Sequence, residues 1–256
     1  VTPTVAAGTG PSSVATEPSG RFAYVANSGA DNNVTPYTIH AATGILTAGT
    51  AVAAGTAPAS VAVDPSGRFV FVTNATSSNV SKFTISSTTG ALTAVGTPTT
   101  TGTTPKVVAV DASGRFLYVA NQGSNSISAF SISTTGSLTA ITGSPFAAGL
   151  SPSGVAVDPS GRFLYVANIN GNNVSAFSIS TTTGVLTAIA GSPFAAGTGP
   201  ISVSVDPSGK FLYVANNTSN NVSVFSIDAT TGALTLVETE TADTGPNSVT
   251  TTGTIQ

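Results

Sequence analysis

Short apolar runs separated by polar turns fill this chain from end to end. In one representative stretch, the apolar segment Val155–Val157 leads through the turn sequence 158–161 into Phe163–Ala167, which is apolar at every position. A polar loop follows, and then the segments Val174–Ile179 and Val185–Ile189. No segment keeps a helical period of about 3.6 residues, and β-branched residues, glycine and proline dominate. The pattern predicts four short β-strands and no helix.

The turn between the first two predicted strands has a sequence with a defined geometry. Asp158, Pro159 and Gly161 stand at its first, second and fourth positions, which suits a type I turn. The strand that follows is apolar on both faces, so we expect neighbouring layers to bury it on both sides.

This unit recurs along the chain. The basic residue before the second strand stands at positions 21, 68, 115, 162 and 210, and a proline opens each unit at positions 11, 58, 105, 152, 200 and 246. We divide a single domain, 1–256, into repeats at about 11–57, 58–104, 105–151, 152–199 and 200–245, with a partial sixth repeat at 246–256. Units of about 40–50 residues with four strands are typical of β-propeller blades, which bury their faces against one another. The sequence therefore predicts an all-β propeller of five four-stranded blades.

Both ends of the chain carry additional strand-like sequence. Thr2–Ala7 is similar to the linker before Pro200, and Asn247–Ile255 is similar to a sixth first strand. These segments could close the ring by pairing with each other, pad it, or insert into a neighbouring molecule, because strand addition to an open edge supplies main-chain hydrogen bonds. The predicted partner is the protein itself, through terminal strand pairing or exchange, or else a cell-surface partner.

The aromatic residues follow the repeat. The three recurring sets are Phe22, Phe69, Phe116, Phe163 and Phe211; Tyr24, Phe71, Tyr118, Tyr165 and Tyr213; and Tyr37, Phe83, Phe130, Phe177 and Phe225. Phe146 and Phe194 complete the count in the linkers. A ligand pocket seldom needs five copies of one ring, whereas packing between blades does, so we interpret these rings as core.

Charged residues make up only 7% of the chain, with Asp and Glu 10 against Lys and Arg 7. Such a chain has no basic surface for nucleic acid, no apolar run of about 20 residues for a membrane span, and no cysteine for a disulfide. Ten of the charged residues form acid–base pairs around the repeated turn: Glu17 and Arg21, Asp64 and Arg68, Asp111 and Arg115, Asp158 and Arg162, and Asp206 and Lys210. We interpret these pairs as braces for the turn. The alternative is a ring of cations around an anionic ligand.

Few other residues could carry chemistry. His40 is the single histidine, and Glu238, Glu240 and Asp243 follow one terminal strand. We expect no metal site, no cofactor and no catalytic residue among them, because a lone histidine lacks a second ligand and edge charges commonly block aggregation. One set of polar residues recurs at the end of the second strand and is the candidate for ligand binding on the rim loops: Asn27, Asn74, Asn121, Asn168 and Asn216.

The consensus Val-Asp-Pro-Ser-Gly-Arg-Phe-Leu-Tyr-Val-Ala-Asn, followed by Asn-Val-Ser and later by Thr-Gly-x-Leu-Thr, resembles the YVTN-type repeats of lactonase-family β-propellers. The resemblance covers residues 11–246. It implies a propeller, and the family includes enzymes similar to 6-phosphogluconolactonase as well as surface-layer proteins. Family lactonases have seven blades, with His and Arg at the channel mouth. Because this chain has five repeats and one histidine, no active-site residue is carried over onto it.

These observations lead us to expect a non-enzymatic extracellular or cell-surface propeller, a structural or interaction module able to self-assemble through its terminal strands. One alternative is a lactonase-type hydrolase of sugar lactones that depends on His40 or on the repeated arginines. A second is a carbohydrate-binding lectin. The chain starts at Val1 without a methionine or a visible signal peptide, which suggests a processed segment found outside the cell.

Overall fold

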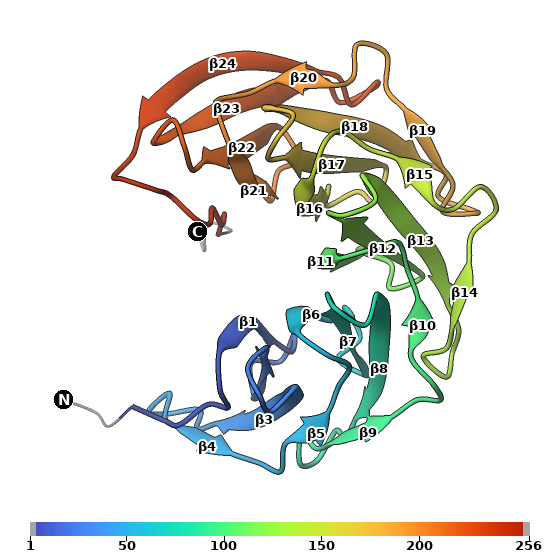
Figure 1. The fold of residues 1–256 in the computed structure, drawn as a ribbon, viewed down its shortest axis with the longest axis vertical. Coiled ribbons are helices and arrows are strands. Elements are labelled where there is room, and N and C mark those ends of the chain that lie inside the picture. Colours follow the sequence, from blue (N-terminus) through green and yellow to red (C-terminus); the bar gives the residue numbers. More distant parts are fainter. Residues whose placement is uncertain (1–3, 253–256) are drawn as a thin grey trace.

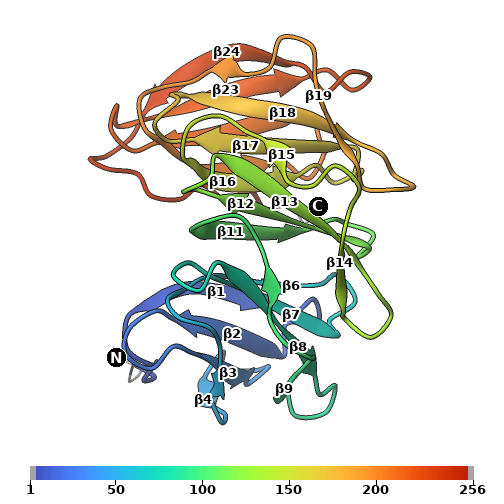
Figure 2. The ribbon, with the colours of Figure 1, turned by 45° about the vertical axis from the view of Figure 1, so that its right-hand side comes forward.

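The computed structural model describes residues 4–252, and its strands confirm the all-β prediction. Five antiparallel sheets follow one another around a common centre (Figure 1), and neighbouring sheets stack face to face (Figure 2). We number these blades 1–5 in chain order. No helix of the described residues is long and apolar enough to cross a membrane.

Each blade repeats the same strand order from the centre outward. The first strands are β1 (Pro11–Thr16), β6 (Pro58–Val63), β11 (Pro105–Val110), β16 (Pro152–Val157) and β21 (Pro200–Val205). The second strands are β2 (Phe22–Asn27), β7 (Phe69–Asn74), β12 (Phe116–Asn121), β17 (Phe163–Asn168) and β22 (Phe211–Asn216). The third strands are β3 (Asn33–Ile39), β8 (Asn79–Ile85), β13 (Ser126–Ile132), β18 (Asn173–Ile179) and β23 (Asn221–Ile227).

In four of the blades, the outermost layer consists of two short strands where the sequence predicted one. The fourth strands are β4 (Leu46–Ala48), β9 (Leu92–Ala94), β14 (Leu138–Ala140), β19 (Leu186–Ala188) and β24 (Leu234–Thr241), and four blades add a short fifth strand, β5 (Val52–Ala53), β10 (Thr99–Thr100), β15 (Phe146–Ala147) or β20 (Phe194–Ala195). The fourth and fifth strands of a blade both pair with its third strand. Gly96, Gly143 and Gly191 have positive φ between the two pieces, which turns the backbone out of the sheet. In blade 5, β24 runs on with a single irregularity in its pairing to β23.

The predicted turn forms, but its acidic and basic side chains have different partners from those expected. The Gly161 N–H donates to the Asp158 carbonyl oxygen at 2.9 Å, and Gly161 has a φ of 70°. The Asp158 carboxylate accepts the backbone N–H groups of Arg162 and Phe163, each at 2.7 Å. The Arg162 guanidinium instead stacks over the Phe163 ring, 5.0 Å from its centre. The acid therefore braces the backbone of the turn, and the arginine covers the ring beside it.

Packing between blades forms the core, as the aromatic pattern predicted. Side chains at 163, 165 and 167 of β17 pack against blade 5, where they meet Leu212 and Val214. The Tyr165 hydroxyl is fully buried and donates to the carbonyl oxygen of Gly232 at 2.9 Å. We call the side of a blade that faces the next blade its trailing face, and the opposite side its leading face.

The terminal segments of the described residues, 4–9 and 246–252, lie on different blades (Figure 1). The N-terminal segment (4–9) lies on blade 1, where the Tyr37 hydroxyl donates to the carbonyl oxygen of Ala6 at 2.8 Å. The C-terminal segment (246–252) lies on β21, where the Thr251 hydroxyl donates to the carbonyl oxygen of Val205 at 2.8 Å. Residues 4–9 and 246–252 belong to no strand or sheet, so within the described residues these segments do not close the ring by pairing with each other. Residues 2–3 and 253–255 of the predicted terminal strands lie outside the described residues.

Candidate functional site

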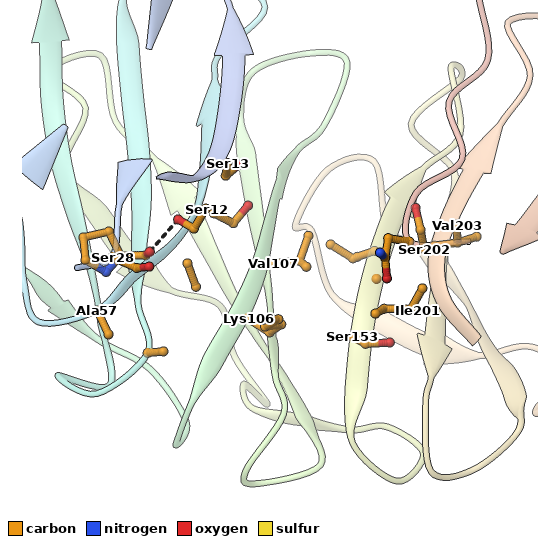
Figure 3. A pocket seen from close by; sticks show the side chains of 17 residues that line it. Ser12, Ser13, Ser28, Ala57, Lys106, Val107, Ser153, Ile201, Ser202 and Val203 are labelled. Carbon is orange, nitrogen blue, oxygen red and sulfur yellow. Dashed lines mark hydrogen bonds between the residues drawn. The ribbon is translucent and has the colours of Figure 1, made fainter. Parts of the chain in front are cut away.

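The first strands of successive blades line a central cavity of about 500 Å³ (Figure 3). Each first strand has a β-bulge at its second residue, which takes that side chain out of the alternation between the two faces of the blade. The second residue of each first strand lines the cavity, together with the matching residue of the C-terminal segment: Ser12, Ala59, Lys106, Ser153, Ile201 and Asn247. The cavity wall is therefore a part of the repeat at which the residue type differs from blade to blade.

The serines of this wall hold neighbouring blades together. The Ser12 hydroxyl donates to the carbonyl oxygen of Pro58 at 2.7 Å, and the Ser153 hydroxyl donates to that of Pro200 at 2.9 Å. Each bond joins one first strand to the next. Because each hydroxyl group donates its proton to a neighbouring strand, it keeps only its acceptor capacity for a ligand.

Lys106 on β11 is the one charged side chain among the described residues that line the cavity. It is exposed, and Figure 3 places it between Ser28 and Ser153. Its position carries serine, alanine or isoleucine in the other blades. Lys106 was not predicted as a site residue, because the sequence shows a cation that breaks the repeat but does not show that its position faces the axis.

The five asparagines predicted to bind a ligand are fully buried at the ends of the second strands. The Asn168 amide nitrogen donates to the Asn173 side-chain oxygen at 2.8 Å and to the Ser175 hydroxyl at 2.9 Å. Gly149 of the linker packs on this amide, and a β-carbon there would lie 2.5 Å from its nitrogen. The asparagines thus brace the loop between the second and third strands, and their contact with a ligand stays a prediction.

The remaining candidates lie away from the cavity. His40 is exposed in the turn after β3, where its Nδ1 lies 2.9 Å from the Thr43 hydroxyl. Glu238 and Glu240 are exposed on β24, the outer edge of blade 5. Among residues 4–252, no group of three or more histidine, aspartate or glutamate side chains could hold a metal ion.

Lys82 is a buried amine that supports the outer layer of blade 2. Its Nζ donates to the carbonyl oxygen of Thr97 at 2.6 Å and to the Thr99 hydroxyl at 2.8 Å. Burial lowers the pKa of Lys82. Because its partners belong to the segment that leads into β10, we assign it to the structure of that loop.

Comparison with known proteins decides the family. The model described as lactonase, seven-bladed β-propeller, matches residues 1–109, 101–199 and 145–251. The chain belongs to this lactonase family. No curated protein matches this lactonase-family chain.

Solved structures share its fold. A protein from Lactobacillus plantarum is 24% identical, with a TM-score of 0.82 over 96% of this chain and 75% of that one. The periplasmic gluconolactonase PpgL of Pseudomonas aeruginosa is 20% identical, with a TM-score of 0.79 over 92% and 71%. A putative 6-phosphogluconolactonase from Bacteroides uniformis is 18% identical, with a TM-score of 0.69 over 92% and 86%.

Family membership corrects one expectation drawn from the sequence. The expectation of a non-enzymatic structural module is wrong, because the matching family is one of lactonases. The error came from counting reactive side chains by type. Most of the reactive side chains recur with the repeat and belong to its turns and packing. Lys106 lines the central cavity instead, and a count by residue type cannot distinguish it from other surface charges.

Proposed function

We propose that this lactonase-family chain hydrolyses a sugar lactone in its central cavity, with gluconolactone as the representative substrate. Family membership is the observation that carries the proposal. The names of two similar structures, a periplasmic gluconolactonase and a putative 6-phosphogluconolactonase, support the substrate class. The cavity of about 500 Å³ supports the location, since small-molecule sites measure about 300–1,000 Å³.

Lys106 is the residue that we assign to the reaction. Hydrolysis adds water to the lactone carbonyl carbon and breaks its bond to the ring oxygen, which yields the open-chain hydroxy acid. Negative charge develops on the carbonyl oxygen, and a positioned cation stabilises it. The Lys106 ammonium would hold this oxyanion, while the Asn247 amide and the serine hydroxyls orient the sugar.

The cavity wall offers no conventional general base within residues 4–252. No carboxylate or imidazole is among the described residues that line the cavity. The proposed acceleration therefore depends on stabilisation of the oxyanion and on orientation of the substrate. A single oxyanion donor commonly contributes about 10²–10³-fold to the rate.

The test follows acid release from glucono-δ-lactone at constant pH, corrected for spontaneous hydrolysis. We expect Lys106→Met to lower kcat/KM by about 10²-fold. Lys210→Met is the matched control, because Lys210 is exposed at a turn outside the cavity and its loss should leave kcat/KM unchanged. Absence of turnover above the spontaneous rate would refute the proposed hydrolase activity. Full activity of Lys106→Met would refute the assigned residue.

We also propose that the protein acts outside the cytoplasm. A periplasmic enzyme stands among the similar structures, and this similarity supports the location. Fractionation of the source cells should place the protein with periplasmic or secreted markers. Recovery with cytoplasmic markers alone would contradict this location.

A further inference from the structure

The first strand is the inner edge of each blade, where every second N–H group points away from the sheet. In blade 4, the Asp158 N–H donates to the Phe163 carbonyl oxygen at 3.0 Å. Hydrogen-bonded and non-bonded pairs alternate from this pair along β16 and β17, so Val155 and Val166 form a non-bonded pair. The Val155 N–H is therefore directed away from β17. Blade 5 has the same register, which directs the Val203 N–H away from β22.

A serine of the preceding blade accepts this N–H in blades 2 and 3. The Ser13 hydroxyl accepts the Val61 N–H at 3.2 Å, and the Ser60 hydroxyl accepts the Val108 N–H at 3.4 Å. Each serine directly follows the bulged residue of its first strand. The third residue of one first strand therefore covers the inward N–H of the next.

This serine is missing ahead of blades 4 and 5. Val107 and Gly154 stand at its place, and neither side chain carries an oxygen. No side chain of the described residues accepts the N–H of Val155 or of Val203. Both valines line the central cavity, whereas the described lining includes neither of the matching valines of blades 2 and 3. Figure 3 shows Val107 and Val203 on this wall. The cavity thus has two free main-chain donors.

Gly154 also keeps the Val203 N–H uncovered by its size. A β-carbon at residue 154 would lie 2.9 Å from the Ile201 carbonyl oxygen and 3.2 Å from the Val203 nitrogen. The approach of β16 to β21 therefore leaves no room for a serine. Lys106 lies on the same wall, and no carboxylate of the described residues lines the cavity. Two fixed N–H donors and one ammonium suit an oxyanion.

We propose that the N–H groups of Val155 and Val203 form an oxyanion subsite of the central cavity. The subsite takes the carbonyl oxygen of the lactone during hydrolysis and the carboxylate of the hydroxy acid afterwards. Lys106 supplies charge, and the main-chain donors supply a direction that the strands hold fixed before the ligand arrives. The inference rests on the proposed function for the identity of the ligand, whereas the two donors follow from the strand register alone.

Gluconate, the hydroxy acid formed from glucono-δ-lactone, is the probe, and the amide resonances of ¹⁵N-labelled protein report its binding. We expect saturable shifts for Val155 and Val203 and little change for Val61, whose N–H already has an acceptor. Val107→Ser places the hydroxyl of the repeat beside the Val155 N–H. It should abolish the Val155 shift and weaken gluconate binding about tenfold, the effect of one competing hydrogen bond. Val107→Ala is the matched control, because it removes methyl groups without adding an acceptor, and its affinity should stay within about twofold of the parent.

Val107→Thr repeats the test with a side chain of the same shape as valine, so the test stands if Val107→Ser fails to fold. Gluconate affinity in the folded serine or threonine variant equal to that of Val107→Ala would overturn the subsite. Lactone turnover by the parent with unshifted Val155 and Val203 amides would also overturn it and leave the hydrolase standing. Saturable shifts at both amides in a protein without turnover would support the subsite and refute the hydrolase activity.

Discussion

Blades 4 and 5 have the same second-strand sequence, Phe-Leu-Tyr-Val-Ala-Asn, yet their trailing faces differ in burial. Phe163 in blade 4 is 5% exposed, whereas Phe211 in blade 5 is 37% exposed. Tyr165 donates a hydrogen bond to Gly232 of blade 5, and Tyr213 occupies the same position beside an open recess. The residues are equivalent, and the neighbour differs. Burial in this molecule is therefore a property of the interface between two blades rather than of the repeat.

The leading faces repeat this contrast at the other end of the arc. Val155 on β16 is 8% exposed, and Val14 on β1 is 65% exposed. In repeat architectures, stability is approximately a sum of unit terms and nearest-neighbour interface terms. Matched substitutions at inner and terminal positions measure the interface term separately, because each pair shares its strand position and local sequence.

The largest difference should come from the phenylalanine pair. We expect Phe163→Ala to lower the free energy of unfolding by about 3–5 kcal/mol, because the ring is buried between blades 4 and 5. Phe211→Ala should cost about 1 kcal/mol, since much of that ring already contacts water. Urea unfolding of the two variants measures the difference. Equal costs would show that the two faces are equally covered in solution.

The aspartate of the turn gives the next contrast. The Asp158 carboxylate accepts the N–H groups of Ser160, Arg162 and Phe163, and it is buried. Asp158→Ala leaves these donors unpaired, so we expect a loss of about 2–3 kcal/mol. Asp206→Ala removes equivalent bonds at the terminal face, where water replaces them, and should cost about 1 kcal/mol. Urea unfolding measures both losses. A larger loss of unfolding free energy for Asp206→Ala than for Asp158→Ala would contradict the role of the neighbouring blade.

Features that recur in the sequence could be predicted from it. The turn at 158–161, the strand 163–168 buried on both sides and the aromatic packing each appear in several copies, so chance agreement was small. Features that depend on a neighbour could not. The exposure of Phe211 follows from what stands beside blade 5, and the position of Lys106 on the cavity wall follows from the β-bulge at the second residue of β11. Neither is encoded in the local pattern.

A smaller contrast is expected for the valines of the first strands. Val155→Ala removes two buried methyl groups from the interface with blade 3, and we expect a loss of about 1–2 kcal/mol. Val14→Ala should change the free energy of unfolding by less than about 0.5 kcal/mol, since the side chain is exposed. Both positions are in a first strand, so differences in strand propensity cancel. If Val14→Ala were as costly as Val155→Ala, the leading face of blade 1 would be covered.

The tyrosine pair gives the smallest effect at neutral pH and adds a dependence on pH. Tyr165→Phe leaves the Gly232 carbonyl oxygen without its donor, so we expect a loss of about 1 kcal/mol, against almost none for Tyr213→Phe. Burial raises the pKa of Tyr165, and the charge of Asp158 raises it further. The folded protein therefore keeps a proton that the unfolded chain releases near pH 10, so stability falls as pH rises above about 10. Urea unfolding between about pH 9 and pH 12 should show a shallower fall for Tyr165→Phe than for the parent chain, and an unchanged slope would place Tyr165 in contact with water.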